Sequence, residues 1–450
     1  MATSYSDCLD LLYQTADKLK SYRDADRVEN VEIHRAVNRI ASSTCLSPNA
    51  TPLYDTSAMH GFLIDSEVTR NATPTSPVAF KVVGTIIPGV QPPKFIDNCQ
   101  RSERICLEIM TGGRFPPNGS QLSKLDACVP LEQVSLSSTL ISGTETTIKT
   151  IIITKPIHSG AHRRRADNDI ARGESLVERG QRIASTHIMP IASVGLQTLP
   201  VFTKPRIGIW TTGSEFALAD SAAAPDVNGP YLTTACNEVG ADTRHLGYLA
   251  DDLKALCFGL GDTADEGDFD VLITTGAVSV GKFDYVRDAL GSLSAEILFH
   301  GVSIRPGHPV LFAILPSKNH HKPIAFFGLP GNPGAAATCF RFLVVPYLRR
   351  LLDMPVEESI RALTQKYSDD NAHVNENHVI FRGKGGTDCF VPGHLVATSS
   401  GRNHVQVRSK TIPAKLEPFI SSNCWVHVQS GHDVLENQIV DCYPTSLASI

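Results

Sequence analysis

Apolar strands that alternate with helical segments between residues 204 and 352 constrain the fold of this chain more than any other feature. Three stretches lead from such a strand into a glycine-rich loop, and the last two continue into a helix: KPRIGIWTTG (204–213), FDVLITTGAVSVGKFDYVRDAL (269–290) and KPIAFFGLPGNPGAAATCFRFLVV (322–345). Strands that are apolar on both faces and alternate with helices are typical of parallel sheets covered on both sides. The pattern therefore predicts a central α/β domain with a parallel sheet.

The N-terminal residues predict helices. Apolar residues recur at helical spacing in 6–20, and Ser6 or Asp7 is placed to cap that helix. A second short helix is expected at 30–41, and helical pattern returns at 167–184 after the basic run HRRR (162–165). We expect the later segment to pack beside the N-terminal helices, which makes the first domain discontinuous.

The remaining segments predict β-rich modules. Short β-branched runs such as VAFKVVGTII (78–87) lie between about 46 and 150, and residues from about 361 onward contain HVIFRG, CFVPGHL, HVQVRSK and CWVHVQS. The expected architecture is α/β plus β-rich domains. Its four domains are a discontinuous helical domain (1–45 and 151–200), a small β domain (46–150), the α/β domain (201–358) and a C-terminal β domain (359–450).

Composition excludes several classes of protein. The 450 residues carry 41 Lys and Arg against 46 Asp and Glu, a net charge of −5, which argues against a generally basic nucleic-acid binder. No apolar run approaches the roughly 18 residues of a membrane-spanning helix. The 11 cysteines form no Cys-x-x-Cys pair and the N-terminus has no secretory pattern, so a cytoplasmic enzyme with reduced thiols is expected.

The three loops predict an anion site. In open parallel sheets, ligands bind at the carboxyl ends of the strands, where helix starts and glycines admit phosphate-like groups. The loop residues that we expect to line this site are Thr212, Gly213, Gly276, Ser279, Gly281, Pro330, Gly331 and Pro333.

Acidic residues accompany these loops. Glu215, the pair Asp251–Asp252 and Asp284 follow predicted strands, and carboxylates beside a phosphate site suit Mg²⁺. An alternative is that Asp251 and Asp252 only cap the helix that begins at Leu253. Both roles are compatible.

Motifs over nearly the whole chain resemble the molybdopterin molybdenumtransferase family, which includes bacterial MoeA and the gephyrin E domain. The motifs are YDTSAMHGF (54–62), IMTGGRFPPN (109–118), DACVPLEQ (126–133), RRRADNDI (163–170), TTGSE (211–215), TTGAVSVGKFDY (274–285), IRPGHP (304–309) and GLPGNPGAA (328–336). The closing stretch NCWVHVQSGHDVLENQIVDCYP is similar to the family's last strands.

The resemblance implies an elongated homodimer that cleaves adenylylated molybdopterin and joins molybdate to its dithiolene, releasing AMP. A divalent cation takes part, and a molybdopterin adenylyltransferase is a further candidate partner. Matching positions imply metal- or water-binding carboxylates at Asp169, Glu215, Asp252 and Asp284, with Glu215 and Asp252 as metal ligands. Substrate contacts are implied for Thr111, Ser279, Gly281 and Lys282, positive charge for Arg305, and pocket shape for Pro330 and Pro333.

Several family positions differ here. His60 replaces the Asp of Ser-Ala-Met-Asp-Gly, where it could act as an acid or base. His308 replaces a Lys, Ala277 replaces a Gly, and YLTT (231–234), with Leu232 and Thr234, stands for Tyr-Asp-Ser-Asn. The alternatives to an insertase are a paralogue that acts on another phosphorylated or adenylylated small molecule, or a non-catalytic scaffold.

Overall fold

The computed structural model describes residues 2–23, 27–93, 103–140, 147–213, 225–276, 285–319, 322–366, 379–397, 401–407 and 415–446. The chain divides into two compact units. Unit one comprises Met1–Ser43, Glu178–Ala184 and Thr198–Ile450, and unit two comprises Thr44–Val177 and Ser185–Gln197. Among these described residues, no helix has the length and hydropathy that crossing a membrane requires.

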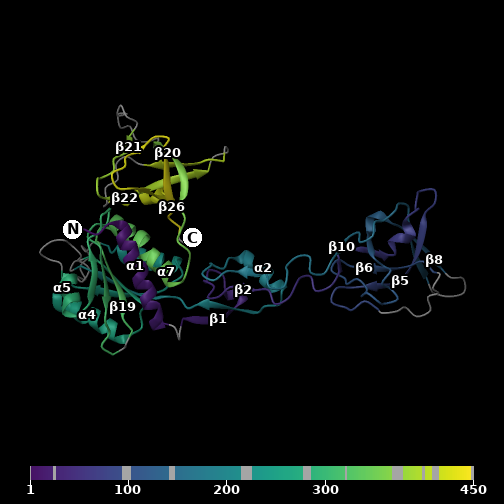
Figure 1. Ribbon diagram of the computed structural model, residues 1–450, viewed down its shortest axis with the longest axis horizontal. Coiled ribbons are helices and arrows are strands. Elements are labelled where there is room, and N and C mark those ends of the chain that lie inside the picture. The colour runs from purple at the N-terminus through teal and green to yellow at the C-terminus, as the bar shows by residue number, and fades with distance from the viewer. Residues whose placement is uncertain are drawn as a thin grey trace. The chain divides into compact units, whose positions relative to one another are not determined.

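A six-stranded sheet forms the centre of unit one (Figure 1). Its order is β14-β13-β15-β19-β18-β16, with β13 (Arg206–Thr212), β14 (Asp242–Leu249), β15 (Val271–Thr275), β16 (Glu296–His300), β18 (Leu311–Leu315) and β19 (Ile324–Leu329). The first four strands are parallel, as expected, whereas β18 and β16 are antiparallel to their neighbours. The sheet is mixed because the short connection 301–310 joins β16 to β18, and a parallel pair needs a longer crossover.

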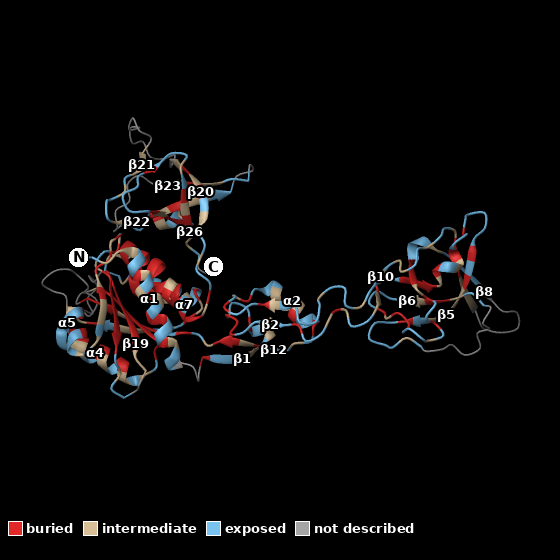
Figure 2. Ribbon diagram, in the orientation of Figure 1, coloured by how far each residue is buried: buried red, intermediate tan, exposed pale blue. Residues whose placement is uncertain are grey.

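Helices cover both faces of this sheet, as the sequence predicted. Val271 and Ile273 of β15 belong to the core shared with α1, α3, α6 and α7, while Leu272 faces the core shared with α4 and α5. Burial therefore runs along the whole strand, and the outer surfaces of the helices are exposed (Figure 2). The helices are α1 (Tyr5–Lys20), α3 (Asn228–Glu238), α4 (Leu253–Glu266), α5 (Tyr285–Ser292), α6 (Pro333–Cys339), the π-helix η6 (Phe340–Val344) and α7 (Val345–Leu351).

Helix α1 confirms the predicted helix at 6–20 and packs along α7 (Figure 1). The predicted cap at Ser6 or Asp7 is wrong, because the helix begins earlier. Ser4 is the N-cap, and its Oγ accepts a hydrogen bond from the Asp7 amide (3.1 Å). Leu12 and Ala16 are fully buried against the sheet domain.

Two other predicted helices are absent. Residues 30–41 contain part of β1 (Val28–Glu32) and the 3-10 turn η2 (Ile33–Arg35), and β1 pairs antiparallel with β12 (Thr198–Phe202). Within 167–184 the structure has the strand β11 (Ser175–Val177), and helix α2 begins only at Ser185. In both segments, pairing with a strand distant in sequence overrides the local pattern.

The C-terminal β-rich module also lies in unit one. Its sheet order is β17-β22-β23-β20-β26-β24, and β21 pairs with β25. Each of the four predicted strands has a counterpart within the described residues. The bounds are β17 (Ile304–Arg305), β20 (Ile360–Lys366), β21 (Val379–Phe381), β22 (Asp388–Ala397), β23 (Asn403–Val407), helix α8 (Pro418–Ser421), β24 (Cys424–Val428), β25 (Val434–Leu435) and β26 (Ile439–Pro444).

Unit two contains a six-stranded sheet of order β7-β4-β6-β5-β9-β8, with an apolar core on each face. Two short pairings, β2 with β11 and β3 with β10, and helix α2 complete it. The bounds are β2 (Cys45–Leu46), β3 (Thr56–Ser57), β4 (Gly61–Ile64), β5 (Val78–Ile86), β6 (Ile105–Ile109), β7 (Ala127–Pro130), β8 (Ser135–Leu140), β9 (Thr147–Ile153), β10 (Arg163–Arg164), β11 (Ser175–Val177) and α2 (Ser185–Ser193). Its described residues also form the 3-10 turns η3 (Ser66–Thr69) and η4 (Leu131–Gln133), while the turn η1 (Ser21–Arg23) follows α1 in unit one.

Candidate functional site

The carboxyl ends of four parallel strands meet at one edge of the central sheet. Thr211 of β13 lies opposite Thr275 of β15, and Thr275 lies opposite Leu329 of β19. On the other side, Thr212 lies opposite Leu249 of β14. The turn between β16 and β18 reaches the same edge, because β18 starts opposite the end of β19. This edge gathers the predicted residues Thr212, Gly213, Asp252, Gly276, Arg305, His308, Pro330, Gly331 and Pro333.

Gly276 allows the strand ends to pack closely. It has a positive φ of 98°, and a Cβ there would lie 2.6 Å from both the carbonyl oxygen and Oγ1 of Thr212. A Cβ on Gly331 would lie 3.4 Å from the Gly276 Cα, which is an ordinary van der Waals contact. Glycine is therefore required at position 276, where Thr212 at the end of β13 fills the space of a side chain.

Two of the glycine amides are already bonded. Gly213 N–H donates to the Leu249 carbonyl (3.2 Å), and Gly276 N–H donates to the Leu329 carbonyl (3.1 Å). These two amides therefore hold the strand ends together and are not free to bind an anion. Their glycines contribute close packing to the site.

The start of helix α6 has features of an anion site that Gly213 and Gly276 lack. Pro333 occupies the first turn, and the N-cap residue Asn332 makes no side-chain capping bond. The first N–H groups of this helical segment are consequently not occupied by a side-chain cap. Such groups and the helix dipole favour oxyanions.

Asp252 caps helix α4. Its Oδ1 accepts hydrogen bonds from the amides of Lys254 (2.9 Å) and Ala255 (3.1 Å). The capping role that the sequence left open is therefore present. One carboxylate oxygen is committed to it, and a metal ion has only the other oxygen available.

His308 and Arg305 supply the basic groups of this edge, and both are exposed. Nδ1 of His308 lies 2.7 Å from the Val302 carbonyl oxygen. A carbonyl only accepts, so Nδ1 carries the proton and Nε2 remains available. Arg305 lies in β17, whose pairing with β22 of the C-terminal module fixes its backbone.

Two polar residues at this edge, Asp226 and Asn228, were missed in the sequence. Asp226 accepts hydrogen bonds from Oγ1 of Thr211 (2.9 Å) and from the Gly229 amide (2.9 Å). Nδ2 of Asn228 donates to Oγ1 of Thr275 (2.8 Å) and to the Gly331 carbonyl (2.8 Å). The sequence pattern that could have indicated these two residues is Asp-x-Asn directly before Gly-Pro, at the start of a helix.

Asp226 and Asn228 thus place an acid and an amide at this edge, a few residues before 231–234, where Leu232 and Thr234 carry neither group. Leu232 is fully buried in the core. Thr234 is exposed, and its hydroxyl bonds to the Pro230 carbonyl of its own helix (2.9 Å).

Unit two brings together three other predicted segments, 54–62, 109–118 and 163–170. The Ser57 amide donates to the Gly113 carbonyl (2.9 Å), and the Ala58 amide donates to the His162 carbonyl (2.9 Å). The Thr111 amide donates to Nδ1 of His60 (3.3 Å). His60 thus provides an acceptor at the position of the family's Asp, as a carboxylate would.

Two arginines of the basic run in this unit form ion pairs. Arg163 donates to Asp55 (Nε–Oδ2, 2.5 Å), and Arg164 forms an ion pair with Asp169. Burial disfavours the charged form of Asp55, but the Ala166 amide and Arg163 outweigh it and hold the pKa of Asp55 below its usual value. Asp169 is exposed and already neutralised by a cation.

Several predicted residues lie outside the described part of the chain: Glu215, Ala277, Ser279, Gly281, Lys282 and Asp284. Within the described part, no three His, Cys, Asp or Glu side chains are grouped as a metal site. Among the described residues, Asp252 by itself offers too few oxygen ligands for a Mg²⁺ site.

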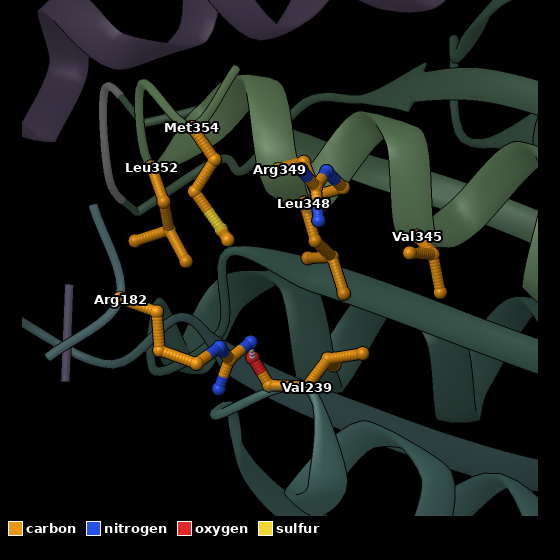
Figure 3. A pocket seen from close by; sticks show the side chains of 7 residues that line it. All are labelled: Arg182, Val239, Val345, Leu348, Arg349, Leu352 and Met354. Carbon is orange, nitrogen blue, oxygen red and sulfur yellow. Dashed lines mark hydrogen bonds between the residues drawn. The ribbon is translucent and has the colours of Figure 1, made fainter. Parts of the chain in front are cut away.

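A small hollow in unit one is distinct from this edge (Figure 3). Five apolar residues and two arginines line it, and none is a predicted site residue: Arg182, Val239, Val345, Leu348, Arg349, Leu352 and Met354. It lies near the C-terminal ends of α3 and α7, and burial lowers the pKa of both Arg182 and Arg349. The candidate site is therefore the sheet edge.

Comparisons with known proteins agree with this fold. Residues 3–195 match the family described as MoeA N-terminal region (domain I and II), and residues 208–350 match a probable molybdopterin binding domain. A crystal structure of the MoeA protein from Pyrococcus horikoshii OT3 is similar with a TM-score of 0.70 over 98% of this chain and 99% of that chain, at 20% identity.

Curated relatives extend over most of the chain. The molybdopterin molybdenumtransferase of Synechococcus elongatus is 28% identical over 447 residues, 97% of each chain. That of Bacillus subtilis is 27% identical over 357 residues, 78% of this chain and 77% of its own. The fold and the sheet-edge site define a multidomain protein built around a molybdopterin-binding type of α/β domain. This chain belongs to the molybdopterin molybdenumtransferase (MoeA) family.

Proposed function

We propose that this chain is a molybdopterin molybdenumtransferase, which cleaves adenylylated molybdopterin and inserts molybdate into the dithiolene to give molybdenum cofactor and AMP. The observation that carries the proposal is likeness over 97% of both chains to a curated enzyme of that name. A paralogue with another substrate and a non-catalytic scaffold are not favoured by these relatives.

The chemistry of the sheet edge supports the proposal. Molybdate and the phosphoanhydride are oxyanions, and cleavage of the latter needs charge stabilisation and alignment more than a protein nucleophile. His308 Nε2, Arg305 and the uncapped start of α6 offer donors or positive charge beside the strand ends.

The proposed reaction also involves a metal ion, a second copy of the chain and a partner enzyme. We expect a divalent cation, with Glu215 and Asp252 as ligands, a homodimer, and exchange of substrate with a molybdopterin adenylyltransferase in the cytoplasm. Thr111, Ser279, Gly281 and Lys282 are expected to contact the substrate. Asp169 and Asp284 are expected to bind metal or water, and His60 to act as an acid or base.

The test offers the full-length protein adenylylated molybdopterin, molybdate and Mg²⁺ and measures AMP release. We expect AMP in proportion to cofactor formed, and loss of both after removal of the cation with EDTA. Addition of Mg²⁺ should restore the rate. A folded protein that releases no AMP under any of these conditions would refute the proposal.

A further inference from the structure

One buried amide, that of Asn228, joins two of the loops at the sheet edge. Its residue is 8% exposed, at the start of α3. Nδ2 donates to Oγ1 of Thr275, the last residue of β15, and to the carbonyl of Gly331 in the loop after β19, both at 2.8 Å. A single nitrogen atom therefore spans the ends of two neighbouring strands.

The orientation of this amide follows from its partners. The Gly331 carbonyl only accepts hydrogen bonds, so the atom that faces it must be the nitrogen. Oδ1 is then buried and has no partner within the described residues. Leaving a buried acceptor unbonded is unfavourable, and the two hydrogen bonds that Nδ2 donates offset this cost.

The backbone that carries Asn228 is itself fixed to the neighbouring strand. Asp226, whose side chain is 7% exposed, binds both Thr211 at the end of β13 and the Gly229 amide. A Cβ on Gly229 would lie 2.3 Å from Oδ2 of Asp226, so this close contact requires glycine. The first turn of α3 is thus anchored to β13, and Asn228 reaches from it to β15 and β19.

We propose that Asn228 is a positioning residue for the transferase reaction. It holds the Gly276 turn and the Gly331 turn at a fixed separation and so preorganises the edge that receives the oxyanions. This inference rests on the proposed function for its kinetic consequences, and on the described hydrogen bonds for its structural ones. Asn228 acts through the two turns, since its own polar atoms are buried.

The expected effect is large because alignment at a reacting centre is sensitive to small displacements. A shift of about 1 Å in positioning groups costs on the order of a hundredfold in rate. We expect Asn228→Ala to lower kcat/KM for AMP release by about ten- to a hundredfold, mainly through kcat.

The experiment combines Asn228→Ala, Thr275→Val and the double variant in the full-length protein. Because Thr275 Oγ1 is one partner of the amide, the double variant should be little slower than Asn228→Ala alone. Thr234→Ala is the matched control. Its exposed hydroxyl bonds to the Pro230 and Tyr231 carbonyls of its own helix, and we expect the kcat/KM of this variant to stay within about twofold of the wild type.

Hydrogen exchange supplies a readout that is independent of activity. The Gly276 amide bonds to the Leu329 carbonyl, so Asn228→Ala should accelerate exchange at Gly276 and in 329–332, with α4 unchanged. A role confined to global stability would instead change exchange throughout unit one and leave kcat of the folded enzyme intact.

The outcomes separate the two proposals. Wild-type kcat/KM in Asn228→Ala, independent effects of Asn228→Ala and Thr275→Val, or unchanged exchange at the two turns would each overturn the positioning role. If the wild type itself releases no AMP, the proposed function fails. Local exchange in Asn228→Ala then still decides whether the amide holds the turns together.

Discussion

At the scale of single residues, Asp252 combines a helix cap with a candidate metal ligand. Oδ1 accepts two amide hydrogen bonds at the start of α4. Asp and Asn cap helices about equally well, but only Asp carries charge. Substitution by Asn therefore separates the two roles.

We expect Asp252→Asn to keep the wild-type free energy of unfolding within about 0.5 kcal/mol, and Asp252→Ala to lose about 1 kcal/mol. If Asp252 also binds the cation, the rate of AMP release should fall more than about tenfold in both variants. A higher Mg²⁺ concentration should then be needed to reach the half-maximal rate. Denaturant unfolding and Mg²⁺ titration of the rate measure these effects. Wild-type activity in Asp252→Asn would show that Asp252 caps helix α4 and does not bind the cation.

Asn228 shows why part of the site could not be predicted from the sequence. An Asp-x-Asn-Gly sequence favours a turn or a helix start, and nothing local indicates which distant groups its side chains meet. The partners of Asn228 lie 47 and 103 residues away, in two other loops. The glycine-rich loops were predictable because glycine and proline mark such turns directly.

At the scale of elements, the close approach of strand ends determines the shape of the site. Gly276 has a positive φ and backbone of β13 directly beside it. The predicted strands agree with the structure here, because a continuous apolar run indicates a buried strand without reference to distant residues. The two absent helices fall where short strands pair with partners far along the chain.

Gly276→Ala should lower the rate of AMP release by about a hundredfold or more, because the backbone at 276 must move to relieve the contact with Thr212. Gly291→Ala is the control: it lies in α5, where an added Cβ meets nothing within 4 Å. That substitution should be neutral or stabilise the protein by about 0.5–1 kcal/mol. Steady-state rates and thermal unfolding measure both. Near-normal rates in Gly276→Ala would show that the turn tolerates displacement.

At the scale of the whole molecule, ion pairs fasten segments of unit one that are distant in sequence. Asp353, after α7, binds Lys20 of α1 (2.6 Å), Arg27 (2.9 Å) and Arg179 (2.5 Å). Burial disfavours its charged form, but the hydrogen bonds and charges of these three cations outweigh it and lower the pKa of Asp353. One carboxylate thus connects the N-terminal helix, the segment Glu178–Ala184 and the α/β domain.

Asp353→Asn should destabilise unit one by about 2–3 kcal/mol at neutral pH, since three cations lose a charged partner. A lowered folded-state pKa stabilises the fold above the unfolded pKa of about 4, and this contribution disappears as pH falls through the folded value. The difference between variant and wild type should therefore shrink below about pH 4. Denaturant unfolding at several pH values measures it.

Glu32→Gln is the control for that series. Glu32 pairs with Arg35 at 3.7 Å with side chains 58% and 74% exposed, so its loss should change stability by less than about 0.5 kcal/mol. A pH-independent effect of Asp353→Asn would contradict the lowered pKa.

The resemblance to the family, carried by its motifs, is visible in the amino-acid sequence, as are the α/β and β-rich composition and the glycine-rich stretches after three apolar runs. The composition and these stretches are encoded locally, in apolar runs, glycines and prolines. Tertiary structure alone decided that β18 and β16 run antiparallel, that 28–32 is a strand, and that Asp226 and Asn228 bind the strand ends. Those outcomes depend on strand pairing and hydrogen bonds between residues far apart in sequence, whose free energies exist only once the chain has folded.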